Sequence, residues 1–169
     1  MIVLIGYMGS GKSTLGRLLA KESGAEFVDL DKKIEEKTGK NIPQIFELYG
    51  EYFFRKIEYI VLKEELSKRV GVLATGGGTP TFFDSMNLIN TKGTSVYIKV
   101  STSELVSRLM HESETRPIIQ GKSETELNRF ISNHLKEREE YYSKAHHLIE
   151  NNVQEEAMRL LRKLANSTV

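Results

Sequence analysis

The hydrophobic residues of the chain fall in short runs that alternate with longer amphipathic stretches. Five apolar runs predict β-strands at residues 2–5, 26–29, 72–75, 95–100 and 147–150. The stretches between and after them predict helices at residues 12–23, 32–37, 43–49, 51–69, 103–110, 124–142 and 154–165. Short apolar strands that alternate with helices are typical of a parallel sheet covered by helices. The pattern therefore predicts the α/β class, with a five-stranded parallel sheet.

Two segments do not fit this alternation. Residues 32–69 form a helical block that is longer than a simple crossover needs, and Gly50 divides it. Residues 111–123 are rich in charge and contain Pro117 and Gly121 as helix breakers. The first segment could wall off a substrate pocket and the second could be a mobile lid, or they could be a decorated crossover and an exposed loop. No repeat or low-complexity linker divides the chain, so we expect residues 1–169 to form one domain.

A phosphate-binding motif follows the first predicted strand. Residues 6–13 fit the pattern Gly-x-x-x-x-Gly-Lys-[Ser/Thr]. Backbone N–H groups of such a loop can surround phosphate oxygens because no Cβ obstructs their approach. The following helix adds unpaired N–H groups and the positive end of its dipole. Lys12 supplies a charge for the β and γ phosphates, and the Ser13 hydroxyl can hold Mg²⁺. These features indicate a P-loop NTPase fold of three α/β/α layers.

Two other interpretations of this loop are weaker. A glycine-rich turn with an exposed lysine would not need a strand before it and a helix behind it. A dinucleotide-binding loop requires a third glycine where Thr14 stands, and it requires close helix packing where Lys12 stands. The P-loop interpretation is therefore favoured.

Composition limits the classes of partner. The chain has 169 residues, enough for one domain with a sizeable core. Its 24 basic and 23 acidic residues nearly cancel, so nothing favours nucleic acid or an anionic membrane as the main partner. There are no cysteines, which excludes disulfides and thiolate metal sites. The first apolar run is too short for a signal peptide, and no later stretch approaches a membrane span. We expect a cytoplasmic protein, with a monomer as the default.

Two aspartates end the second predicted strand. Asp29 and Asp31 alternate across its carboxyl end, which faces the ligand crevice in an open parallel sheet. One carboxylate can face the hydration shell of Mg²⁺ while the other reaches a second substrate. Alternatively, Asp31 merely caps the helix that starts at Lys32, although capping would not explain Asp29.

A glycine run and three arginines are further candidates. Residues 75–79, Thr-Gly-Gly-Gly-Thr, follow the third strand, where a backbone could approach a small molecule closely; a flexible turn is the alternative. Arg55 has Glu58 three residues later and could form a surface ion pair. Arg138 stands in a charged helix and alone would mean nothing. Arg116 is more distinctive because the following proline constrains the chain around it.

Taken together, these motifs resemble the shikimate kinase family over about residues 1–150. The P-loop occurs in many kinases, but the ordered combination is much more selective. It comprises residues 6–13, Phe-Val-Asp-Leu-Asp at 27–31, Gly50 with Phe54-Arg55-x-x-Glu58, Thr-Gly-Gly-Gly at 75–78, Arg-Pro-Ile-Ile at 116–119 and Glu137-Arg138-x-x-x-Tyr142.

The resemblance implies transfer of the γ-phosphoryl group of ATP to the 3-hydroxyl of shikimate, on the route to chorismate and the aromatic amino acids. It implies that Mg²⁺ takes part, with Ser13 coordinating the ion and Asp29 holding its water shell. ATP would be bound by residues of the loop and of two later segments, namely Gly9, Ser10, Gly11, Lys12, Ser13, Thr14, Arg108, Arg116 and Gln154. Of these, Arg108 would stack on adenine, and Arg116 would move with the lid to neutralise charge on the transferring group.

The resemblance also implies an acceptor site. Asp31 would orient the reacting hydroxyl and take its proton. Arg55 and Arg138 would clamp the shikimate carboxylate, because a planar guanidinium suits two oxygens. The glycine run, Gly76, Gly77 and Gly78, would line the pocket, with the Gly77 amide on a substrate hydroxyl. Lys12, Asp31 and Arg116 would then be the catalytic residues.

The chain departs from the family pattern in two places. Asn-Asn-Val-Gln at 151–154 stands where an adenine-contacting loop of variable length is usual, and Gln154 is assigned to ATP from this position alone. Residues 79–83 are more aromatic than expected, which puts the rim of the pocket in doubt.

Three rival functions remain to be compared. A related kinase for gluconate or a nucleoside monophosphate would not need both Arg55 and Arg138. A GTP-driven switch would need an Asn-Lys-x-Asp signature, and residues 90–93 fail it. A catalytically inactive nucleotide-binding module would not need to retain Lys12, Ser13, Asp29, Asp31 and Arg116 together.

Overall fold

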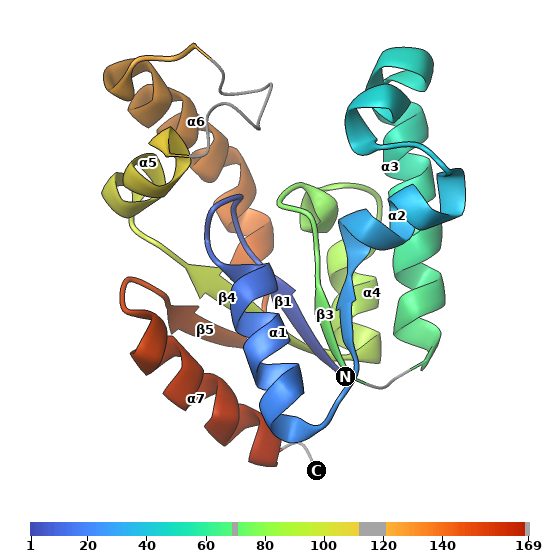
Figure 1. Ribbon diagram of the computed structural model, residues 1–169, viewed down its shortest axis with the longest axis vertical. Coiled ribbons are helices and arrows are strands. Elements are labelled where there is room, and N and C mark those ends of the chain that lie inside the picture. Colours follow the sequence, from blue (N-terminus) through green and yellow to red (C-terminus); the bar gives the residue numbers. More distant parts are fainter. Residues whose placement is uncertain (69–70, 112–120, 168–169) are drawn as a thin grey trace.

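A parallel sheet forms the centre of the molecule. The computed structural model describes residues 1–68, 71–111 and 121–167 (Figure 1). Its strands are β1 (Ile2–Ile5), β2 (Phe27–Asp29), β3 (Val72–Ala74), β4 (Thr94–Lys99) and β5 (His147–Glu150). Each paired strand runs parallel to its neighbour, in the order β2-β3-β1-β4-β5, so the predicted five-stranded parallel sheet is confirmed. The strand order changes direction beside β1, and ligands of open α/β sheets bind at the carboxyl ends of the strands near such a point.

Helices cover both faces of this sheet (Figure 1). Alternate residues of β1 point to opposite faces. Ile2 and Leu4 belong to a core with α1 (Lys12–Ser23) and α7 (Gln154–Ser167). Val3 and Ile5 belong to a second core, formed with α3 (Ile42–Lys68), α4 (Ser85–Lys92), α5 (Thr102–Met110) and α6 (Glu124–Tyr142). The two cores confirm the predicted three-layer α/β/α arrangement.

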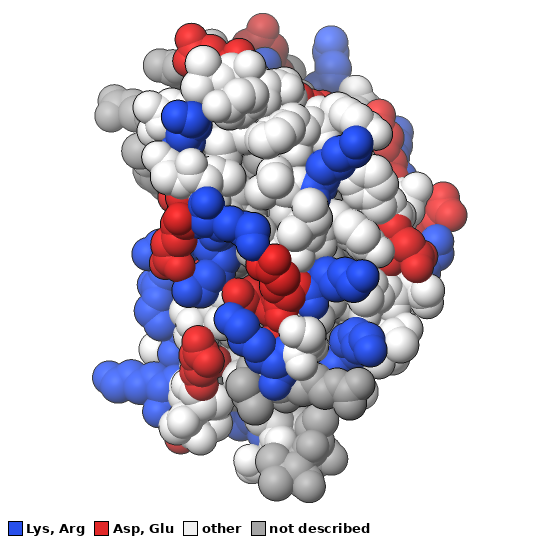
Figure 2. All heavy atoms as spheres, turned by 90° about the vertical axis from the view of Figure 1, so that its right-hand side faces the viewer, with Lys and Arg blue, Asp and Glu red and all other residues white. Residues whose placement is uncertain are grey.

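The helical block after β2 rises beside the edge of the sheet. It contains α2 (Leu30–Thr38) and α3, which pack on each other (Figure 1). Gly50 interrupts α3 with a φ of 76° and a ψ of 173°, so the predicted division at this residue is confirmed. Figure 2 shows acidic and basic side chains interspersed on the face that these helices help to form. The first half of α3 also exposes apolar side chains at Leu48, Tyr49 and Tyr52.

Two features differ from the sequence-based expectations. A short 3₁₀ helix (Thr79–Thr81) and α4 occupy a segment for which no helix was predicted. Helix α4 is only eight residues long and buries Ser85, Met86 and Ile89, too few apolar positions for a clear helical period. Asp31 lies in the first turn of α2 and not at the end of a strand.

The predicted lid, residues 111–123, falls mostly outside the described residues. None of the helices in the described part of the chain combines the length and apolar composition that crossing a membrane needs.

Candidate active site

The P-loop connects β1 to α1, and its backbone binds the side chain of Lys12. The Lys12 ammonium donates to the carbonyl oxygens of Gly6 and Tyr7, each at 2.9 Å. Gly11 precedes the helix in a left-handed conformation with a φ of 88°, which favours glycine. The buried ammonium therefore lies beside the loop, at the position where a phosphate would meet it.

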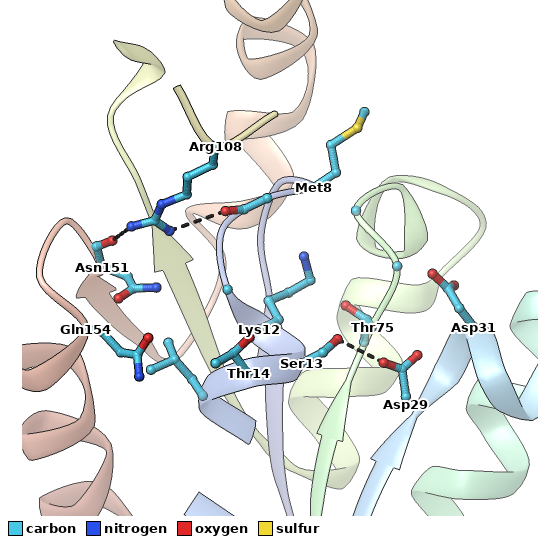
Figure 3. Close-up of a pocket in the computed structure, with 15 residues that line it drawn as sticks. Met8, Lys12, Ser13, Thr14, Asp29, Asp31, Thr75, Arg108, Asn151 and Gln154 are labelled. Atoms are coloured by element: carbon cyan, nitrogen blue, oxygen red, sulfur yellow. Dashed lines mark hydrogen bonds between the residues drawn. The ribbon is translucent and has the colours of Figure 1, made fainter. Parts of the chain in front are cut away.

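Two later segments brace the outer side of this loop. Asn151, directly after β5, donates from Nδ2 to the Ser10 carbonyl at 2.7 Å. Arg108 of α5 donates from Nη1 to the Gly9 carbonyl at 3.3 Å and from Nη2 to the Asn151 carbonyl at 2.7 Å (Figure 3). Within a peptide plane the C=O and the following N–H point in opposite directions. Because Arg108 and Asn151 hold the Gly9 and Ser10 carbonyls, the N–H groups of Ser10 and Gly11 point away from these two side chains.

The side chains of Ser13 and Asp29 are hydrogen-bonded to each other at the loop. The Ser13 hydroxyl donates to Oδ2 of Asp29 at 2.8 Å (Figure 3). Asp29 is also the N-cap of α2, because its Oδ1 accepts from the Lys32 amide at 3.5 Å. The alternative that Asp31 caps this helix is therefore wrong, since the cap is Asp29, two residues earlier.

The oxygens of Ser13 and Asp29 suit Mg²⁺, which typically uses one or two protein oxygens, several waters and substrate phosphates. In the described ranges no cluster of three or more histidines or carboxylates could hold a metal by itself.

The Asp31 carboxyl lies between the phosphate loop and the glycine run. A Cβ added at Gly76 would lie 3.1 Å from Oδ1 of Asp31, so a side chain at this position would crowd the carboxyl. Burial raises the pKa of Asp31 to about 6, with the negative charges of Glu58 and Asp29 adding to the effect and Lys12 opposing it. At neutral pH the carboxyl is mostly ionised and its affinity for a proton is increased. These are properties of a general base.

Arg55 packs against the other side of the glycine run. Its Nη1 donates to Glu58 at 2.8 Å, and the side chains of the two residues are only 11% and 3% exposed. The ion pair predicted from their spacing exists, but it is buried and not a surface pair. A Cβ added at Gly78 would lie 2.8 Å from Nη2 of Arg55, and the guanidinium lies 4.1 Å from the centre of the Phe82 ring. The guanidinium is thus fixed beside the glycine run.

Arg138 reaches the same region from α6. Its guanidinium lies 5.4 Å from the centre of the Tyr7 ring, next to the P-loop. Four residues later on the same helix, Tyr142 donates its hydroxyl proton to the carbonyl of Gly77. The two arginines therefore approach the glycine run from different helices.

One cavity of about 420 Å³ brings most of the predicted residues together. The predicted residues that line it are Gly9, Gly11, Lys12, Ser13, Thr14, Asp29, Asp31, Gly76, Gly77, Arg108 and Gln154 (Figure 3). Ser10, Gly78, Arg55 and Arg138 are not among its lining residues. The Ser10 carbonyl is held by the lining residue Asn151, and Gly78 directly follows the lining residue Gly77. Arg55 lies against Gly78, and Arg138 lies against Tyr7 of the P-loop. Arg116 lies outside the described residues. Asn151 and Thr75 also line the cavity. The sequence predicted the motif that contains Thr75 but no role for Thr75 itself, and it did not predict Asn151 as a site residue.

The comparisons with known proteins decide the family. The family model for shikimate kinase matches residues 8–168, which is nearly the whole chain. The chain belongs to the shikimate kinase family. Curated members support this: the chain is 46% identical to the shikimate kinase of Parabacteroides distasonis over 85% of its length and 83% of that relative. It is 42% identical to the shikimate kinase of Bacteroides fragilis over 98% and 96% of the two chains.

Solved structures of shikimate kinases also resemble this chain. The crystal structure of the Bacteroides thetaiotaomicron enzyme superposes with a TM-score of 0.89 at 35% identity, covering 98% of this chain and 97% of that one. The Acinetobacter baumannii enzyme in complex with shikimate has a TM-score of 0.88 at 36% identity, covering 99% and 94%. The chain is therefore a kinase of this family, and the resemblance found from its motifs is confirmed.

The sequence carries different amounts of information about Asn151 and Thr75, the two further residues of the cavity. Asn151 directly follows a predicted strand, and strand ends are where ligands bind in this fold, so its position was a usable signal. Thr75 directly follows β3, and its hydroxyl donates to the Leu4 carbonyl at 3.1 Å, which the sequence pattern does not reveal.

Proposed function

We propose that this chain transfers the γ-phosphoryl group of ATP to the 3-hydroxyl of shikimate, giving shikimate 3-phosphate and ADP. The observation that carries the proposal is that Lys12, Asp31, Gly76 and Gly77 line one cavity. It offers a phosphate-binding side and an acceptor side, with a carboxylate of raised pKa between them. The bound shikimate in the related Acinetobacter baumannii structure supports the identity of the acceptor.

ATP binds on the loop side of the cavity. The N–H groups of residues 9–14 surround the phosphates, and the Lys12 ammonium exchanges its loop carbonyls for phosphate oxygens. Arg108 and Gln154 lie along the same side, toward the base. The in-plane hydrogen bonds of Arg108 leave the flat face of its guanidinium available for stacking on adenine. Ser13 and Asp29 would hold Mg²⁺, which would offset the negative charge of the phosphates.

Shikimate binds on the glycine side. Arg55 and Arg138 pair with its carboxylate, and the backbone N–H groups of the glycine run donate to its oxygens. Asp31 accepts the proton of the 3-hydroxyl as that oxygen bonds to the γ-phosphorus, while the bond from the γ-phosphorus to the bridging oxygen of ADP breaks. Arg116 is proposed to stabilise the charge on the transferring group, and residues 111–123 to be the lid that carries it.

Further proposals concern the whole protein. We expect one kinase domain over residues 1–169, in which residues 32–69 form the substrate-binding region. The chain is proposed to act in the cytoplasm as a monomer, in the synthesis of chorismate and the aromatic amino acids, with no nucleic acid or membrane partner.

A panel of acceptors tests the function. Purified protein with Mg-ATP should release ADP in a coupled assay when shikimate is added, but not with gluconate or AMP. These two compounds are the acceptors of the rival kinases. AMP has no carboxylate for the two arginines, and gluconate carries its carboxylate on an open chain and not on a ring with three hydroxyls. The absence of stimulation by millimolar shikimate would overturn the assignment.

A further inference from the structure

The hydrogen bonds of the glycine run separate its carbonyls from its N–H groups. The Gly76 and Gly78 carbonyls accept from the amides of Thr79 at 3.3 Å and Thr81 at 2.9 Å, and the Gly77 carbonyl accepts from the Tyr142 hydroxyl. Among the described residues, no acceptor binds the N–H groups of residues 76–78. The run thus presents backbone donors at the edge of the cavity while its acceptors are occupied.

Tyr142 is the distant member of this arrangement. It is fully buried at the end of α6, where its ring packs on Tyr97 with 5.0 Å between the ring centres. A phenol has one proton, and here that proton goes to the Gly77 carbonyl. The hydroxyl therefore fixes the plane of the peptide between Gly77 and Gly78. Because C=O and N–H are opposed in that plane, the Gly78 N–H is directed away from Tyr142.

The same hydroxyl lies beside Arg138. The two residues are four positions apart on α6 and so share a helix face. Burial raises the pKa of Tyr142, and the charge and hydrogen-bonding contact of Arg138 oppose that rise. Since the hydroxyl proton is already donated to Gly77, the hydroxyl oxygen faces the nearby guanidinium only as an acceptor. Tyr142 therefore lies between a cationic donor and the peptide that carries a backbone donor.

We propose that Tyr142 is a positioning residue for the acceptor substrate: its hydroxyl holds the Arg138 guanidinium and the Gly77–Gly78 peptide in one arrangement, so that both donors meet the same ligand. The inference rests on the proposed function, in which Arg138 and the glycine run bind shikimate. Tyr142 does not touch the substrate. It acts by removing the freedom of two groups that do.

Replacing the hydroxyl alone tests this role. Tyr142→Phe keeps the ring and its packing on Tyr97, but releases both Arg138 and the Gly77 carbonyl. We expect the KM for shikimate to rise about 5- to 20-fold, with the KM for ATP and kcat changed by less than about threefold. A purely structural role would instead lower the folded fraction and reduce all activities together. An unchanged KM for shikimate overturns the inference.

Tyr97→Phe is the matched control. Tyr97 is also a buried tyrosine of the same ring pair, and its hydroxyl donates to Glu139 at 2.9 Å without touching the glycine run. Its replacement should leave the KM for shikimate within about twofold of the wild type. An equal rise in both variants would show that any lost buried hydroxyl has this effect and would overturn the inference.

Two further measurements make the test independent of one variant. In an Arg138→Ala background, Tyr142→Phe should raise the KM for shikimate less than it does in the wild type, because part of its effect acts through Arg138.

NMR of the wild type labelled with ¹⁵N-glycine gives a test that needs no variant. The resonance of the Gly78 amide should shift when shikimate is added. A Gly78 resonance that does not shift overturns the inference even if Tyr142→Phe does not fold. If the wild type does not turn over shikimate, the proposed function is overturned. If the wild type turns over shikimate but Tyr142→Phe leaves the KM unchanged, or its effect on the KM simply adds to that of Arg138→Ala, only the role of Tyr142 is overturned.

Discussion

At the scale of single residues, charge placement decides what the cavity can do. Lys12 is held by the P-loop, on the phosphate side of the site. Arg138 lies beside Tyr7 and Tyr142, on the side proposed for the acceptor. The same cationic chemistry therefore has different consequences at the two positions.

Replacing each cation should separate these consequences. Lys12→Ala should lower kcat by about 100-fold or more, because the charge acts on the phosphoryl group in the transition state. Arg138→Ala should raise the KM for shikimate by about 10- to 100-fold with little change in the KM for ATP, as expected for loss of charge-assisted hydrogen bonds to one ligand. Steady-state kinetics with each substrate varied in turn measures both. Equal losses for both substrates in Arg138→Ala would contradict the carboxylate clamp.

Asp31 links activity to stability through its pKa. Its pKa in the folded protein is about 6, above the usual value of 3.8 for an aspartate, so the folded state binds more protons than the unfolded state between about pH 4 and 6. The contribution of Asp31 to stability is therefore present below pH 4 and is lost as the pH rises through 6.

Asp31→Asn should accordingly stabilise the protein at pH 7.5, by about 1–2 kcal/mol after allowance for partial exposure. The gain should shrink as the pH is lowered toward 4.5. The same variant should lose about 100-fold or more in kcat, because the proton acceptor is gone. Urea unfolding at several pH values checks the first part, and a variant less stable than the wild type at pH 7.5 would contradict the raised pKa.

The sequence predicted Lys12, Ser13 and Asp29 because each belongs to a motif in which residues of a given chemistry stand at a fixed spacing. It did not predict which side chains meet across the fold. The Asn151 contact with Ser10 and the Tyr142 contact with Gly77 join residues 141 and 65 positions apart, and no local pattern encodes them.

At the scale of elements, the break at Gly50 shapes the helical block beside the acceptor side. The backbone there has a φ of 76° and a ψ of 173°, a region that essentially only glycine adopts. A Cβ at Gly50 would meet no atom within 4 Å, so any cost of adding one comes from the backbone alone.

Gly50→Ala should therefore lower the free energy of unfolding by about 2–3 kcal/mol. Gly24→Ala is the matched control, because Gly24 also has open space around it but a left-handed φ of 65° and ψ of 19°. That region is less costly for alanine, and the expected loss is about 1 kcal/mol. Urea denaturation compares the two. A smaller loss at Gly50 than at Gly24 would show that the break is not a required conformation.

Element prediction succeeded where an element was long and clearly periodic, as for α1 and α6. It failed for α4, whose eight residues include Asn87, Asn90 and Thr91, which are weak helix formers. Packing of Met86 and Ile89 into the core stabilises this helix, and such tertiary contacts are invisible in local sequence.

At the scale of the whole molecule, alternating apolar and amphipathic segments sufficed to predict three layers and a parallel sheet. The order of the strands did not follow from that pattern, because it depends on which crossovers pack best. The order β2-β3-β1-β4-β5 places the P-loop after β1 beside the glycine run after β3, since Leu4 pairs with Ala74. The two halves of the site meet because of this neighbour relation.

The central claim is that these two halves carry out one transfer reaction. ³¹P NMR of the wild-type protein with Mg-ATP and shikimate tests it most directly, because it distinguishes a phosphate monoester from inorganic phosphate. We predict one shikimate phosphate monoester for each ADP formed, with the phosphoryl group on the 3-hydroxyl. Release of inorganic phosphate without the monoester, or phosphorylation at another hydroxyl, would contradict the account.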